Sequence, residues 1–141
     1  MKFLKRIFGI CETRMPGDPQ AWSAQNGSVR IDLTRMPELK TPGSGVRLEG
    51  QGLDPRLMVF HGDDGQYHAI ANRCTHMGRR IDTIAGSHTI QCCSVSKSTF
   101  TYDGQPVGGA AKKPVKAYPV AQDGETLIIS LSYQRKVRSY R

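Results

Sequence analysis

The sequence lacks any long run of apolar residues. No stretch of its 141 residues approaches the roughly 18 apolar residues that a membrane-spanning helix needs, so no transmembrane segment is predicted. The N-terminal stretch "MKFLKRIFGIC" begins with basic residues, but its apolar part is too short and too interrupted for a secretion signal. We therefore expect a cytoplasmic protein, and a length of 141 residues favours one domain with a real core.

Cysteine is scarce, and the motifs of common enzyme classes are missing. Four cysteines, two of them adjacent at Cys92 and Cys93, make a poor disulfide framework. In a reducing compartment, cysteine near histidine is more often part of a metal or redox site. The sequence contains no Ser-His-Asp arrangement, P-loop or dinucleotide-binding signature. It therefore favours a metal or redox role over these enzyme classes.

Acidic residues are scarce at both ends of the chain. Residues 1–15 carry a net charge of +3 and residues 133–141 carry +4, whereas the 117 residues between them have 12 basic and 11 acidic side chains. No interleaving of aromatic and basic residues indicates a nucleic-acid partner. The tails are therefore either solvated or dock on an acidic protein or, weakly, on a lipid surface.

The start of the chain predicts one short helix. Leu4, Ile7, Phe8 and Cys11 fall on one face of it, with basic residues on the other. Prolines and a glycine follow, so residues 12–27 are expected to form a linker.

From Ser28 onward the pattern changes to the alternation of β-strands. Val29, Ile31 and Leu33 point one way, with polar residues between them. Further strand-like runs lie at 46–48, 57–61, 67–72, 81–92, 98–107 and 115–131. The sequence therefore predicts an all-β, antiparallel fold of about 8–10 short strands.

Two short stretches carry the strongest functional signal. "NRCTHMG", residues 72–78, places Cys74 and His76 one residue apart. "IQCCSVSKSTF", residues 90–100, contains cysteine and a trailing Ser-x-Phe, but no histidine. Together they resemble the two cluster-binding loops of Rieske iron–sulfur domains, Cys-x-His-x-Gly and Cys-x-x-His followed by Ser-x-Phe/Tyr.

The resemblance extends beyond the two loops. "VFHGDDGQYHAIANRCTH" is similar to the hairpin that leads into the family's first loop. "GGAAKKPVKAYPV" is similar to the segment that closes over the cluster, with Ala110 in place of a proline. The resemblance implies a Rieske-like fold with a small cluster-binding subdomain, its loops at about 73–80 and 91–100. The expected domain covers residues 28–132, between a basic N-terminal segment and a basic C-terminal tail.

The resemblance also implies a set of ligands. In a Rieske [2Fe–2S] centre, two cysteinates bind one iron and two histidines bind the other. Cys74 and His76 match the first pair, and Cys93 matches the second cysteine if Phe100 sets the register. The second histidine is replaced by Ser96.

Two neighbouring positions complete the comparison with the family's second loop. Ser98 matches the serine whose hydroxyl points at a cluster sulfur. Lys97 stands where the family usually has glycine.

The missing histidine leaves four possibilities open. A [2Fe–2S] cluster is kept with Cys92 as the substitute ligand, or with Ser96 or a water completing the shell. Alternatively, the cluster is absent and the fold is an interaction module, or a single tetrahedral Zn²⁺ is bound. The zinc ligands would be Cys74, His76, Cys92 and Cys93. Because Cys92 alternates with Cys93, a buried structural thiol is the other interpretation of Cys92.

The resemblance implies electron transfer rather than catalysis. Rieske oxygenases need a second domain with an iron site of two histidines and one carboxylate, and only ten residues follow Leu131, where the resemblance ends. We therefore expect a small electron carrier or subunit with altered ligation that serves a redox partner with an acidic surface. The alternative is a cluster-free or zinc-bound interaction module within a larger redox complex.

Overall fold

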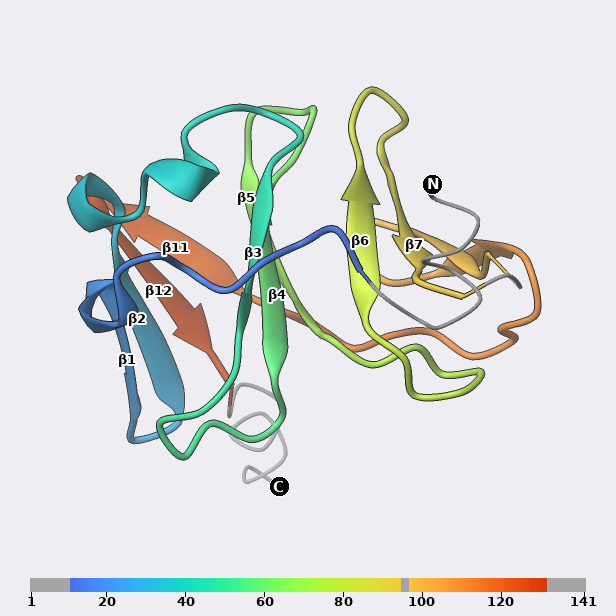
Figure 1. Cartoon of the computed structure of the whole chain (residues 1–141), viewed down its shortest axis with the longest axis horizontal. Helices are drawn as coiled ribbons and strands as arrows, with labels where there is room; N and C mark the ends of the chain where they lie inside the picture. The colour runs from blue at the N-terminus through green and yellow to red at the C-terminus, as the bar shows by residue number, and fades with distance from the viewer. Residues whose placement is uncertain (1–10, 95–96, 132–141) are drawn as a thin grey trace, which may run out of the picture.

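Three antiparallel sheets of four strands each make up residues 11–94 and 97–131, the ranges that the computed structural model describes. The first sheet has the order β1-β2-β12-β11, with bounds Trp22–Gln25, Ser28–Asp32, Thr126–Ser130 and Val120–Asp123. The second has the order β10-β5-β4-β3, with bounds Ala117–Tyr118, Tyr67–Ala71, Leu57–His61 and Gly45–Leu48. The third has the order β6-β7-β8-β9, with bounds Ile81–Ile84, Thr89–Cys92, Thr99–Thr101 and Pro106–Gly108. Figure 1 shows the second sheet between the other two.

The described residues confirm the predicted all-β, antiparallel class. Their only helices are three short 3₁₀ turns, η1 (Pro19–Ala21), η2 (Leu33–Arg35) and η3 (Pro37–Leu39). No helix in these ranges is long and apolar enough to cross a membrane.

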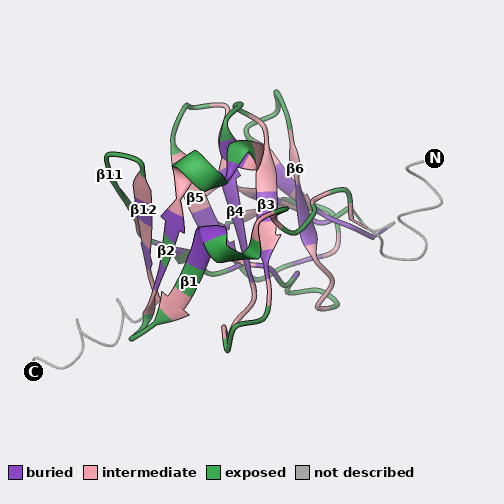
Figure 2. Ribbon diagram, turned by 60° about the vertical axis from the view of Figure 1, so that its left-hand side comes forward, coloured by how far each residue is buried: buried purple, intermediate pink, exposed green. Residues whose placement is uncertain are grey.

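Strand β4 explains why "LMVFH" is apolar without a break. Leu57 and Val59 pack into a core shared with the first sheet, whereas Met58 and Phe60 pack into a second core beneath the third sheet. All four are fully buried, because both faces of this central strand are covered (Figure 2). The strand therefore links the main core to the core that lies under the two loops.

The region before Ser28 differs from the expected linker. Trp22 is buried in the main core and opens β1, which pairs with β2. The two strands are joined by Asn26 and Gly27, whose φ angles are 54° and 77°. Two positive φ values favour the Asn-Gly turn of a tight hairpin. The strand is only four residues long, so its alternation gave little signal.

Residues 11–14 connect the second and third sheets. The carboxylate of Asp82, on β6, accepts hydrogen bonds from the backbone N–H groups of Glu12 and Thr13, at 2.7 and 2.9 Å. Arg14 forms an isolated parallel bridge with Val46 on β3. The predicted N-terminal helix falls on residues 1–10, outside the described residues, except for Cys11.

Candidate metal centre

Two loops approach each other at the end of the third sheet. The first joins β5 to β6 and closes on itself, since the N–H of Cys74 donates to the carbonyl of Arg79 and that of Gly78 to the carbonyl of Cys74. The second joins β7 to β8 and is closed by a hydrogen bond of 2.8 Å from the N–H of Cys92 to the carbonyl of Ser98. Ser96 lies in the second loop, outside the described residues.

The thiols of Cys74 and Cys92 meet between the loops. Both side chains are buried, with 2% and 0% of their surface exposed, and the Cys74 thiol lies within hydrogen-bonding range of Cys92. Burial raises the pKa of the Cys92 thiol to about 11, and the neighbouring Cys74 thiol adds to this effect. The Ser94 hydroxyl lies 3.3 Å from the sulfur of Cys92. The arrangement is therefore a buried pair of sulfur donors, one from each loop.

The histidine of the first loop is exposed beside this pair. His76 donates its backbone N–H to the sulfur of Cys74 at 3.4 Å, while the residue itself lies on the surface. Other imidazoles in the described ranges are held elsewhere. The Nδ1 of His61 is 2.9 Å from the carbonyl of Leu39, and the Nε2 of His68 pairs with Asp64.

Cys93 does not join the thiol pair but forms a disulfide with Cys11. Their Cα atoms are 5.3 Å apart, within the range of ordinary disulfides. Because side chains alternate along a strand, the inward turn of Cys92 directs Cys93 to the other side. One carboxylate oxygen of Asp82 and the two sulfurs lie within 4.8 Å of one another. The four cysteines were expected to make a poor disulfide framework, yet this pair is bonded, and Cys11 was not predicted to lie beside the second loop.

A third segment is bonded to both loops. The Oγ of Ser98, fully buried, accepts a hydrogen bond of 3.0 Å from the N–H of Ala111. Thr75, in the first loop, donates its hydroxyl to the carbonyl of Lys113 at 2.7 Å. Gly109 allows this approach, because a Cβ there would lie 2.5 Å from the Cα of Ser98. Residues 109–113 therefore cover the site, in the place that the resemblance implied.

The second loop contains a residue in an unusual backbone conformation. Lys97 has φ of 51°, in the left-handed region that glycine adopts without strain. This conformation explains why Rieske domains usually have glycine at the position of Lys97. The turn is also closed by a hydrogen bond from the N–H of Lys97 to the carbonyl of Ser94 at 3.1 Å.

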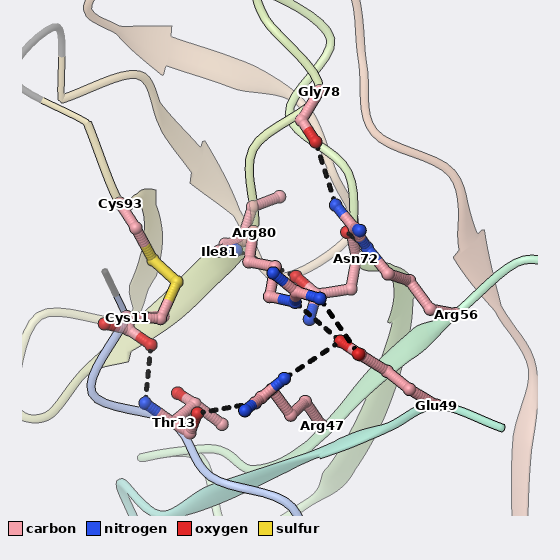
Figure 3. A network of polar contacts seen from close by, with 11 residues as sticks. Cys11, Thr13, Arg47, Glu49, Arg56, Asn72, Gly78, Arg80, Ile81 and Cys93 are labelled. Carbon is pink, nitrogen blue, oxygen red and sulfur yellow. Dashed lines mark hydrogen bonds and ion pairs between the residues drawn. A yellow bond between two sulfur atoms is a disulfide. The ribbon is translucent and has the colours of Figure 1, made fainter. Parts of the chain in front are cut away.

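Side chains from the second sheet and its flanking loops fix the base of the first loop. Arg56 donates to the carbonyls of Asn72 and Gly78, at 2.7 and 2.8 Å. Arg80 forms a two-point ion pair with Glu49 (Figure 3), and these hydrogen bonds hold the pKa of the Glu49 carboxyl below its usual value. Both ends of the loop are thus held by ionic hydrogen bonds.

Positive charge surrounds the candidate centre. Residues 72–80, 91–99 and 108–116 contain no acidic side chain. The exposed cations on these segments are Arg73, Lys97, Lys112, Lys113 and Lys116. Met77, at the tip of the first loop, is 61% exposed. The surface around the loops is therefore positively charged, with the exposed apolar side chain of Met77 in it.

Among the described residues, the donor atoms of Cys74, His76 and Cys92 do not all lie within 4.8 Å of one another, so they fit only part of a [2Fe–2S] cluster. Two buried sulfurs from two loops suit the iron that cysteinates bind. For the second iron, His76 is the one imidazole that the described residues bring to the loops. The candidates for a fourth donor are Cys93, after reduction of its disulfide, Ser96 and a water molecule.

Comparisons with known proteins agree with this geometry. The sequence profile of the Rieske [2Fe–2S] domain matches residues 31–119. No curated protein sequence matches the chain. Among solved structures, the ferredoxin of carbazole 1,9a-dioxygenase from Nocardioides aromaticivorans IC177 is 26% identical, with a TM-score of 0.55 over 66% of this chain and 91% of that one.

Two further structures share the fold. The plasma membrane Rieske protein PetC3 from Synechocystis PCC 6803 is 22% identical, with a TM-score of 0.54 over 67% of this chain and 93% of that one. The Sphingomonas yanoikuyae B1 ferredoxin is also 22% identical, with a TM-score of 0.54 over 64% of this chain and 87% of that one.

Proposed function

Because this chain belongs to the Rieske [2Fe–2S] domain family, we propose that it is a small electron-transfer protein with altered cluster ligation. The observation that carries the proposal is the buried meeting of the Cys74 and Cys92 thiols between two loops. A bound [2Fe–2S] cluster would supply one-electron chemistry at this point. The chain itself would provide the sulfur donors, exclude water from them and present His76 at the surface.

Iron binding would also require the protein to release the thiol proton of Cys92. Thiolates, not thiols, bind iron, so Cys92 must release the proton that its raised pKa retains. Two groups would then stabilise the charged sulfurs. The N–H of His76 already donates to Cys74, and Ser98, whose oxygen accepts from Ala111, still has its hydroxyl hydrogen to donate.

We further propose that the partner is a redox protein with an acidic surface. The loops are surrounded by cations with no acid in the same segments, which favours association with negative charge. The similar ferredoxin from Nocardioides is named for the dioxygenase it belongs to, which supports an oxidoreductase as the partner class. The sequence of residues 1–10 adds three basic and no acidic side chains. We place this association in the cytoplasm.

A second candidate function, without an iron–sulfur cluster, is supported by two observations. Each of them indicates that the set of cluster ligands is incomplete. Ser96 replaces a ligand histidine, and Cys93 is committed to Cys11. Both favour a cluster-free interaction module on the same fold. The zinc-bound form would also need Cys93 as a free thiol, after reduction of its disulfide.

Metal analysis of the purified chain separates the two functions. The electron carrier should be brown, with about two iron and two sulfide per chain and an EPR signal after reduction. Cys74→Ser and Cys92→Ser should each abolish the colour, because each removes one of the two buried sulfurs. Cys11→Ser, purified under reducing conditions, is the matched control and should keep it. A colourless wild-type protein without iron, even after anaerobic reconstitution, would establish the interaction module instead.

A further inference from the structure

The disulfide between Cys11 and Cys93 joins the start of the described chain to a candidate ligand. Cys93 follows Cys92 directly, and the spacing to Phe100 gives it the register of the family's second ligand cysteine. A sulfur held in a disulfide offers no thiolate to a metal. The described structure therefore has Cys92 beside Cys74, with Cys93 withdrawn from the site.

Cys11 is held next to Cys93 by contacts that do not depend on the disulfide. The two hydrogen bonds from Glu12 and Thr13 to Asp82 fix the segment on β6. Arg47, on β3, adds two hydrogen bonds. Its side-chain Nε donates to the carbonyl of Thr13 at 3.2 Å, and its backbone N–H donates to the carbonyl of Arg14 at 3.0 Å. After reduction, these contacts should thus keep Cys11 in place, so the disulfide can close again whenever Cys93 is not bound to metal.

The two cysteine pairs differ in their access to solvent. Cys11 is half-buried at the surface, whereas Cys93, Cys74 and Cys92 expose 3% of their surface or less. Of the two disulfide-bonded residues, Cys11 is therefore the more accessible to a small thiol. Both carboxylate oxygens of Asp82 already accept backbone N–H groups, which favours a dithiol pair over a metal site at this point.

We propose that Cys11 and Cys93 are a reversible thiol–disulfide pair that controls whether Cys93 can bind the cluster. The inference rests on the proposed function. In the disulfide form, the sulfur donors are Cys74 and Cys92. In the dithiol form, Cys93 becomes available as a third donor and supplies the position that the missing histidine leaves open.

The exchange is balanced with a small-molecule thiol such as glutathione. One thiolate attacks the sulfur of Cys11, breaks the bond to Cys93 and releases the Cys93 thiolate. A second thiolate attacks the glutathione sulfur of the mixed disulfide and releases Cys11. In sum, two thiols and the protein disulfide give the protein dithiol and one glutathione disulfide, and the reverse reaction oxidises the pair.

The test compares iron retention in the two redox forms of the full chain. Wild-type protein is reconstituted anaerobically with iron and sulfide, then equilibrated in buffers with different ratios of reduced and oxidised glutathione. Alkylation followed by mass spectrometry measures the Cys11–Cys93 peptide, and a competing chelator measures iron retention. Iron affinity should be lower by roughly tenfold or more in the disulfide form. Cys11→Ser should retain iron equally in every buffer.

Met15→Ser is the matched control, since it changes an exposed side chain of the same segment and keeps both cysteines. It should respond to the glutathione ratio as the wild type does. The proposal is overturned if the linked peptide never forms, or if the disulfide and dithiol forms hold iron equally. Absence of iron from every variant, including Cys11→Ser, would refute the proposed cluster itself and this inference with it.

Discussion

The backbone N–H of Ala111 donates to the hydroxyl of Ser98 across 3.0 Å, between residues 13 positions apart. This bond attaches the covering segment to the second loop in a region from which water is excluded. Its geometry depends on Gly109, which passes over Ser98 with φ of 78°. Ser98 and Ala111 therefore define one wall of the candidate centre.

Gly109→Ala should destabilise the protein by at least about 2 kcal/mol. The new Cβ would lie 2.5 Å from the Cα of Ser98, and alanine is strained at positive φ. Gly108→Ala is the matched control, because its Cβ would meet nothing closer than 3.8 Å, and it should change stability by less than about 0.5 kcal/mol. Urea denaturation measures both. Equal stability of the two variants would contradict the close approach at Gly109.

Cys11→Ser should lower the free energy of unfolding by about 4 kcal/mol under oxidising conditions. The disulfide joins residues 82 positions apart and so restricts the unfolded chain strongly. With excess reductant, the variant and the wild type should unfold at nearly the same denaturant concentration. A difference that persists in reductant would assign the loss to side-chain packing at Cys11 rather than to the bond.

Cys92 should react slowly with iodoacetamide in the iron-free, reduced protein. Its pKa of about 11, against an ordinary value of 9.0, leaves little thiolate at neutral pH. The alkylation rate should rise with pH until about 11 in the folded protein, and only until about 9 in urea. Mass spectrometry of the alkylated peptide follows the reaction.

The same pKa sets the pH dependence of stability. A raised folded-state pKa means that the unfolded chain releases the proton first. The contribution of Cys92 is therefore complete below pH 9 and is lost as the pH rises towards 11. Denaturation of the wild type and of Cys92→Ser at pH 8 and pH 10 measures this contribution, as the difference between their free energies of unfolding. A difference between the two proteins that stays constant over this range would contradict the assignment.

The midpoint potential of the cluster should lie below the Rieske range of roughly −150 to +300 mV. A thiolate or alkoxide in place of the second neutral imidazole adds one negative charge, which favours the oxidised cluster. Ser96→His should raise the potential into that range by restoring an imidazole. EPR-monitored titration of both proteins measures the change. A wild-type midpoint well above zero would show that the fourth ligand carries no charge.

Much of the fold could be predicted from local pattern. The alternation of Val29 and Ile31 correctly predicted β2, which lies in the middle of the first sheet. The continuous apolar run of β4 predicted a strand but not its position between two cores. Strand β1 was missed, although Asn26-Gly27 is a recognised hairpin signal, because "WSAQ" offers only Trp22 and Ala24 as apolar residues.

Site residues could be predicted from the sequence only where a short local motif determines their position. Cys74, His76 and Ser98 lie on the loops that their motifs indicated. The choice between Cys92 and Cys93 depends on which way the end of β7 turns its side chains, and spacing alone favoured Cys93. The role of Cys11 depends on Asp82, 71 positions later, binding the adjacent backbone. No local pattern contains that information.

The Cys11–Cys93 bond also gives the protein a mechanical property. It closes a covalent ring that contains strands β1 to β7, while β8 to β12 lie on the open part of the chain. Force applied between the two ends of the chain would pass through the disulfide and bypass the ring. Without the disulfide, the 82-residue stretch between Cys11 and Cys93 could be pulled out to about 290 Å. Since β12 pairs with β2, the first sheet joins a protected strand to a loaded one. Under load, an oxidised chain would open along this pairing, and reduction would release the remaining length.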